Sequence, residues 1–160
     1  MKAMKKLHVL AMAASAAAIF AIPAAAQNIS GQPNFGTVNL RSGFVPDPRV
    51  VPVVSGGTIA ASRIRSECRG FISGNPDVRV VYTRGNLPLI ISVDSSADTT
   101  LVVNGPDGRF RCDDDGGVNG LNPSIRYDRP ASGRYEIWVG SYRSGENSRA
   151  RVHISEVRSQ

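Results

Sequence analysis

The sequence predicts an all-β protein, an antiparallel β-sandwich with a jelly-roll-like arrangement of strands. From residue 58 onward, short apolar segments recur in which apolar and polar residues alternate, as in strands with one buried face. Turn-forming Gly, Pro, Asn and Asp residues separate these segments. After residue 26, no window of eleven or more residues keeps a helical period. Many short strands at this spacing are typical of sandwiches and jelly rolls.

Each expected strand places its apolar residues on one face. In chain order, the residues expected to face inward are Val78, Val80, Tyr82, Leu89, Ile91, Val93, Leu101, Val103, Tyr135, Ile137, Val139, Ala150, Val152 and Ile154. Turns are expected at residues 74–77, 85–86, 105–108, 115–117 and 144–145. Their glycines allow a positive φ, and their prolines fix φ at about −65°.

The first 26 residues have the pattern of a secretory signal peptide. Lys2, Lys5 and Lys6 form a positive region, an apolar stretch follows, and three alanines after Pro23 suit a signal peptidase. We expect cleavage between Ala26 and Gln27 and a periplasmic or secreted protein with no membrane span after cleavage. The alternative is a retained membrane anchor, for which the apolar stretch is short.

The length of residues 27–160 favours one domain. Residues 27–57 are rich in Gly, Pro, Asn and Ser, and we interpret them as an extended lead-in that lies on the domain or hangs free. Within this lead-in, the apolar run from Val50 to Val54 is a candidate edge strand, since an edge tolerates Pro52. The sandwich itself is expected to span residues 58–160.

The charge of the exported part is modest. The whole chain has 19 Lys and Arg residues and a formal charge of +6. All three lysines precede residue 27, so 16 arginines face 13 acidic residues afterwards, a charge of +3. Acidic residues are interspersed among the arginines, which argues against nucleic-acid binding because that function needs a concentrated basic face.

The chain contains two cysteines, Cys68 and Cys112. In an exported protein one such pair indicates a disulfide. A structural zinc site would need further ligands, and His153 is the only histidine after the signal peptide.

Four short motifs follow one another in the second half of the chain. They are Asp98-Thr-Thr-Leu, Pro106-Asp-Gly, the acidic turn Asp113-Asp-Asp-Gly-Gly and Gly133-x-Tyr-x-Ile-Trp-Val. In this order they resemble the bacterial pre-peptidase C-terminal domain over residues 58–156. The lead-in Gly43-Phe-Val-Pro-Asp-Pro48 is similar to an element of small exported proteins of this type. The resemblance implies a secreted β-sandwich that acts as an accessory module beside a peptidase, but no catalytic domain is present in this sequence.

The sequence contains no complete catalytic motif. His153 is the only candidate base, and the alternation places it on the outer face opposite Val152, where a solvated side chain is expected. There is no Gly-x-Ser-x-Gly elbow. A pair of carboxylates could still serve a glycosidase, although nothing singles one pair out.

The acidic turn is the first candidate site. Asp113, Asp114 and Asp115 are adjacent, and Asp98 and Asp107 could converge on the same end of the sandwich. Such a set could bind Ca²⁺, a cation that some domains of the resembled family hold. The alternative is that these aspartates serve the turn by bonding its backbone, with Arg109 and Arg111 balancing their charge.

An aromatic pair is the second candidate site. Trp138 and Tyr142 share one face of their strand, flanked by Arg134 and Arg143, and an exposed pair could stack on sugars or anchor a protein. Alternatively, residues 27–57 pack over this face and bury Trp138.

These observations favour an exported, non-catalytic binding or accessory module whose partner is an envelope polysaccharide or another exported protein. Two alternatives stay open. One is a secreted hydrolase associated with peptidases, and the other is a calcium-dependent structural or adhesive module.

Overall fold

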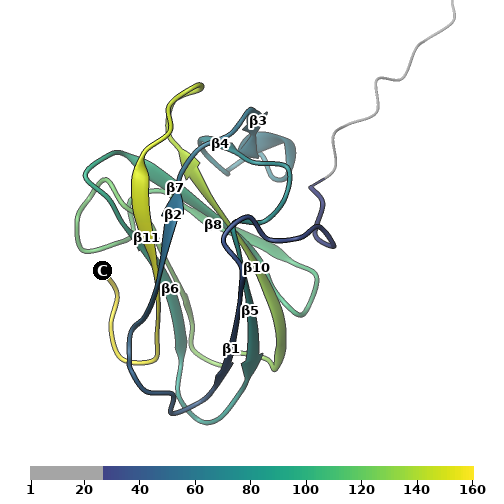
Figure 1. Ribbon diagram of the computed structural model, residues 1–160, viewed down its shortest axis with the longest axis vertical. Helices are drawn as coiled ribbons and strands as arrows, with labels where there is room; N and C mark the ends of the chain where they lie inside the picture. The colour runs from purple at the N-terminus through teal and green to yellow at the C-terminus, as the bar shows by residue number, and fades with distance from the viewer. Residues whose placement is uncertain (1–26) are drawn as a thin grey trace, which may run out of the picture.

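The protein is a sandwich of two β-sheets, seen in a computed structural model that describes residues 27–160 (Figure 1). The expected signal peptide lies outside these residues. The elements are β1 (Thr37–Arg41), β2 (Arg49–Val54), β3 (Ile59–Ala60), the 3-10 turn η1 (Ala61–Arg63), β4 (Phe71–Ile72), β5 (Val78–Thr83), β6 (Leu89–Asp94), β7 (Thr99–Asn104), β8 (Phe110–Asp113), β9 (Ser124–Tyr127), β10 (Gly133–Ser141) and β11 (Arg149–Ser155). The expected all-β sandwich is therefore confirmed.

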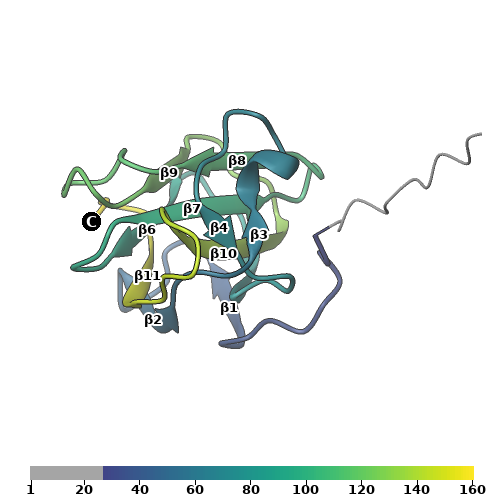
Figure 2. The same ribbon diagram turned by 90° about the horizontal axis from the view of Figure 1, so that it is seen from above.

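The first sheet is built around β10, which pairs with β5 on one side and β7 on the other. β1 extends this sheet beyond β5, β8 extends it beyond β7, and the short β4 and β3 continue it past the start of β5. The second sheet has the order β2-β11-β6-β9. Figure 2 shows the two sheets edge-on, with β1 and β2 as neighbouring edges on one side.

All strand pairs are antiparallel except one. β1 runs parallel to β5 from Thr37 opposite Arg79 to Arg41 opposite Thr83. The sequence did not predict this parallel pair, because β1 belongs to the segment that was not identified as part of a sheet.

The main core lies between the sheets and contains every residue that the alternation placed inward. Each of these side chains is 4% exposed or less. Phe44 and Val51 from the lead-in pack against this core together with Val38 and Leu40 of β1. Burial of this apolar surface is the main source of stability, at about 25 cal/mol per Å².

Residues 27–57 are not an appendage to this fold. β1 pairs along its whole length with β5, and β2 pairs with β11 from Arg49 to Val54. The edge strand expected at Val50–Val54 is confirmed as β2, at the edge of the second sheet, and a division at residue 57 does not separate lead-in from sandwich.

A second, smaller core lies on the outer face of the first sheet. Trp138 and Val102 point outward there and are covered by residues 59–72, which contribute Ala61, Cys68 and Ile72. Cys68 is bonded to Cys112, which confirms the expected disulfide and ties this covering segment to β8.

The structure shows no helix of membrane-spanning length and apolarity within residues 27–160.

Candidate binding surface

Several loops meet at one end of the sandwich because of the strand directions. β1 and β5 run parallel and end together, so residues 42–48 lie beside residues 84–88. β6 starts opposite the end of β9, which brings residues 128–132 to the same end. The end of β11 lies opposite the start of β2 and of β6, and this adds residues 156–158. We call this surface the arginine end.

Five exposed arginines give the surface its name: Arg41, Arg49, Arg84, Arg129 and Arg158. None of the five takes part in the ion pairs formed among residues 27–160. An unpaired guanidinium keeps its five donors free for a carboxylate or phosphate, which it binds in a two-pronged geometry. The arginine end is thus a concentration of positive charge that the nearly balanced composition hides.

The loop formed by residues 42–48 is fixed to the rest of this end. Glu156 accepts hydrogen bonds at 2.6 Å from the Gly43 N–H and from the Tyr82 hydroxyl. Asp47 accepts from the Ser155 hydroxyl and, at 2.8 Å, from the Glu156 N–H. Burial and the neighbouring Glu156 raise the pKa of Tyr82 to about 12, so the phenol stays a donor at physiological pH. The loop is therefore held in one shape before any partner arrives.

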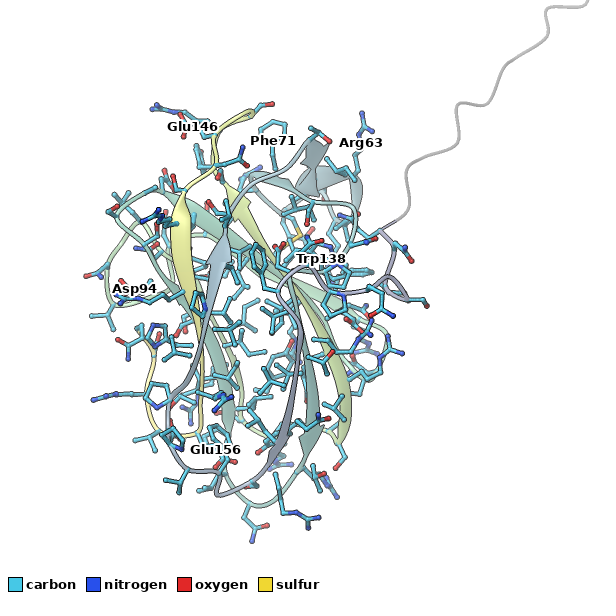
Figure 3. All side chains as sticks on the ribbon, in the orientation of Figure 1. Arg63, Phe71, Asp94, Trp138, Glu146 and Glu156 are labelled. Carbon is cyan, nitrogen blue, oxygen red and sulfur yellow. A yellow bond between two sulfur atoms is a disulfide. The ribbon has the colours of Figure 1, made fainter. Side chains whose placement is uncertain are left out.

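Apolar side chains project between the arginines. Val45, near the middle of the fixed loop, is 91% exposed, and Leu87 and Val157 are also exposed. An apolar projection surrounded by positive charge is a common form of protein-binding surface. Glu156 is labelled at this end of the molecule in Figure 3.

Sequence reasoning did not identify this surface. Its arginines lie far apart in the chain, and only the pairing of β1 with β5 and of β11 with β2 brings them together. One signal was present, the segment Gly43-Phe-Val-Pro-Asp-Pro48. Its Gly43 and Asp47 are the residues that fix the loop, and Gly43 has a positive φ of 83° that favours glycine.

The acidic turn is used by the fold itself. One carboxylate oxygen of Asp113 accepts the N–H of Gly116 at 2.7 Å and that of Ser124, in β9, at 2.8 Å. Arg111 does not face the aspartates, since its guanidinium lies 4.5 Å above the ring of Tyr127.

The other two carboxylates of the expected calcium set lie at opposite ends of β7. Asp98 precedes β7 and is close enough to Asp115 and Asp114 for their charges, together with burial as the largest cause, to raise its pKa. Asp107 follows β7 and accepts the Arg109 N–H at 3.1 Å within its own turn. The expectation that Asp98 and Asp107 converge is wrong. Residues 27–160 hold no group of three or more potential metal ligands, and Ca²⁺ binding by the acidic turn stays a prediction.

The expected aromatic patch is not formed. Trp138 is 0% exposed, whereas Tyr142 is 46% exposed. The alternative expectation of burial holds for Trp138, but the covering segment is 59–72 rather than 27–57. Arg134 and Arg143 lie at opposite ends of β10. Arg134 pairs with Glu136 at 2.5 Å, and Arg143 lies 3.8 Å from Glu146.

His153 lies on the outer face of the second sheet, as the alternation predicted, but it is not solvated. Its side chain is 8% exposed because the C-terminal residues return over this face, where the Gln160 N–H donates to Ser92, the residue opposite His153. Burial lowers its pKa. Neither ring nitrogen has a hydrogen-bond partner among the described residues, so no adjacent group would orient it as a general base.

Comparison with known proteins gives no family. No family model matches the chain, and no curated protein matches it. Among solved structures, the chain is similar to Aeromonas hydrophila PliG, a periplasmic lysozyme inhibitor of g-type lysozyme, with 15% identity and a TM-score of 0.38 over 74% of this chain and 96% of that one. A mutant of the corresponding Escherichia coli protein shows 15% identity and a TM-score of 0.37 over 75% and 97%. Likenesses at this level say nothing about what this chain binds.

Proposed function

We propose that the protein is an exported, non-catalytic module that binds an acidic surface of another exported protein through the arginine end. The observation that carries this proposal is the convergence of five unpaired arginines around a loop already fixed by Glu156 and Asp47. A preformed loop loses little conformational entropy on binding, which favours affinity. The disulfide and the pattern of the first 26 residues support export.

The chemistry of this end favours a protein over the other envelope components. Sugar recognition by stacking needs exposed aromatic faces, and Trp138 is buried. Binding at a lipid interface typically uses Trp and Tyr anchors, whereas the exposed apolar residues at this end are Val45, Leu87 and Val157. Arginine beside aliphatic side chains suits a carboxylate-bearing protein surface, where arginine is enriched among energetically important residues.

The test is capture and reconstitution. Immobilised residues 27–160 are incubated with periplasmic extract and culture supernatant, and each captured protein is purified and its dissociation constant measured. We expect an acidic protein whose affinity falls at least about tenfold in the variant Arg84→Glu/Arg129→Glu and falls with added salt.

As a matched control, a second variant carries the same change in charge at the other end of the molecule. Arg63 and Arg69 are exposed, make no ion pair among residues 27–160 and lie on the covering segment; Figure 3 shows Arg63 at the end opposite Glu156. Arg63→Glu/Arg69→Glu should bind as the unmodified protein does. Equal loss in both variants would point to non-specific attraction and overturn the proposal, as would binding to anionic phospholipid vesicles in place of any protein.

A further inference from the structure

The two neighbouring sheet edges differ in their capacity to accept another strand. Among residues 27–160, β1 pairs only with β5 and β2 pairs only with β11, so each has one edge without a partner strand. Figure 2 shows both edges on the same side of the sandwich. An unpaired edge presents a row of backbone donors and acceptors that another chain can join.

The first and last hydrogen bonds between β1 and β5 show which backbone N–H and C=O groups of β1 point toward β5 and which point away. The Gly36 carbonyl accepts from Arg79 at 3.1 Å, and the Ser42 N–H donates to Thr83 at 2.9 Å. Backbone groups alternate between the two edges of a strand. Even-numbered residues therefore face β5, and Thr37, Asn39 and Arg41 present their N–H and C=O groups to the open edge. Within residues 27–160, no backbone hydrogen bond outside the β1–β5 ladder reaches them.

In contrast, the edge of β2 lacks its central donor. The Ser55 N–H donates to Ser148 at 2.8 Å, so odd-numbered residues face β11 and Val50, Pro52 and Val54 face outward. Pro52 lies in the middle of these outward-facing residues, so its missing N–H weakens the open edge of β2 without removing a hydrogen bond to β11. Proline is a common protection of sheet edges against another strand. β1 carries neither a proline nor a lysine. One edge is thus blocked while its neighbour is left open.

A groove lies along the open edge. It is lined by residues 37–46 and Arg49 and encloses about 500 Å³. Val38, Leu40 and Phe44 are only partly buried there and would be covered by the inward side chains of an added strand. Outward side chains of that strand would lie beside Asn39 and Arg41. Arg41 and Arg49 would meet carboxylates, since neither arginine has an acidic partner among residues 27–160.

From these observations we infer that the β1 edge binds an extended peptide segment of the partner by strand addition, with apolar residues alternating with polar ones and acidic residues near Arg41 and Arg49. This inference rests on the proposed function and assigns the form of the bound segment. A second copy of the chain does not fit the charge, because it would bring its own Arg41 and Arg49 to the same edge. Main-chain pairing would supply affinity, and the alternating side chains would supply specificity.

The experiment is selection from a phage library of random heptapeptides against residues 27–160. Parallel selections use Asn39→Pro, Asn39→Thr, Arg41→Glu/Arg49→Glu and the control Arg63→Glu/Arg69→Glu. Asn39→Pro removes the central outward N–H and leaves the ladder to β5 intact, whereas Asn39→Thr keeps that N–H. We expect enrichment of alternating acidic sequences with the unmodified protein, with Asn39→Thr and with Arg63→Glu/Arg69→Glu, but not with Asn39→Pro. With Arg41→Glu/Arg49→Glu the enriched charge should change from acidic to basic.

Hydrogen exchange tests strand addition directly. An enriched peptide is synthesised, and exchange of the backbone amides of β1 is measured with and without it. Saturating peptide should slow exchange of the Thr37, Asn39 and Arg41 amides at least about tenfold, while the amides that face β5 change little. The inference is overturned if no peptide is enriched, if Asn39→Pro binds the same peptides, or if a dimer that Asn39→Pro dissociates occupies the edge. The captured protein partner provides a further comparison. If Arg84→Glu/Arg129→Glu no longer binds this partner while Asn39→Pro binds it fully, strand addition is overturned and the proposed function stands.

Discussion

Buried carboxylates join segments of this protein that are distant in sequence. Glu136 is held between Arg79 at 2.7 Å and Arg134 at 2.5 Å, and both arginines also donate to carbonyls of the N-terminal segment, at Gly31 and Ile29. A buried charge is tolerated only when it is paired and hydrogen-bonded. The two arginines therefore fasten residues 27–35 across the outer face of the first sheet.

Asp77 performs a similar role without a cationic partner. One of its oxygens accepts the Val139 N–H at 2.7 Å, and the other accepts from the Asn34 amide at 2.9 Å and from the Ser73 hydroxyl at 3.3 Å. Burial outweighs these hydrogen bonds and raises the pKa of Asp77 to about 6. The carboxyl is thus more easily protonated in the folded protein than in the unfolded chain.

The raised pKa of Asp77 predicts a specific dependence of stability on pH. Its contribution to the free energy of unfolding is fully present below about pH 4 and is lost as pH rises through about 6. The unfolding free energy of the unmodified protein minus that of Asp77→Asn should therefore be larger at pH 4.5 than at pH 7.5, by about 2 kcal/mol. Denaturant unfolding of both proteins between pH 4 and 7.5 measures this difference.

Asp128→Asn provides the control, because the Asp128 side chain is 80% exposed in its pair with Arg126. The change with pH predicted for Asp77→Asn should exceed any change measured for this control. A difference for Asp77→Asn that stays constant over the same range would contradict the raised pKa.

At the scale of elements, the covering segment 59–72, which we call the flap, is held by packing, by the pairing of β4 with β10 and by one covalent bond. It has little regular structure of its own, namely η1 and the short strands β3 and β4. Its contacts are with Trp138, Val102 and Phe110. The Cys68–Cys112 bond closes a loop with a sequence separation of 44 residues, which in the chain-entropy account stabilises the fold by about 4 kcal/mol.

Removal of the disulfide should loosen the flap before it affects the main core. In Cys68→Ala/Cys112→Ala we expect a loss of about 4 kcal/mol in unfolding free energy. Emission of Trp138, the only tryptophan of the chain, should shift to longer wavelength as water reaches the ring. Fluorescence spectra and denaturant unfolding measure the two effects.

A reducing agent supplies the control for this variant. It should reproduce both changes in the unmodified protein and leave the double variant unaffected. A stability loss with unchanged emission would show that the flap stays docked on Trp138 without the bond.

The predictability of these elements from sequence follows the strength of their local pattern. The inward positions of Val78, Val80 and Tyr82 in β5 were predicted correctly, because apolar residues alternate there without interruption. β1 was missed, since Thr37–Arg41 has only two apolar residues and pairs in parallel with a strand far along the chain. The burial of Trp138 was one of two alternatives drawn from the sequence, but its cover was misassigned because residues 59–72 pack through irregular structure and a disulfide.

The sites were less predictable than the strands for a related reason. The acidic turn attracted attention because its aspartates are consecutive, yet local hydrogen bonds of Asp113 explain much of that pattern. The arginine end is formed by residues from Arg41 to Arg158, which are far apart in the sequence, so no local sequence pattern predicts it. Only the Gly43–Pro48 segment carried information, and its meaning depends on Glu156, more than a hundred residues away.

At the scale of the whole molecule, the two ends of the sandwich differ in charge. The arginine end carries five unpaired arginines, while at the other end Asp98, Asp114, Asp115 and Glu146 lie near cations such as Arg143 and Arg63. A small net charge therefore conceals a local concentration of positive charge, which attracts an acidic partner during approach.

The integration of residues 27–57 into both sheets predicts the outcome of truncation. Removal of residues 27–57 deletes β1 and β2, exposes the paired edges of β5 and β11 and uncovers core residues packed by Val38, Leu40, Phe44 and Val51. We expect residues 58–160 to show no cooperative thermal transition by circular dichroism. Deletion of residues 27–33 alone keeps both strands and should leave a cooperative transition at a moderately lower temperature, since only contacts such as that of Arg79 with Gly31 are lost. A cooperative, unshifted melt of residues 58–160 would instead make the N-terminal segment a separable appendage, and the groove along β1 would then have no structural role in the sandwich.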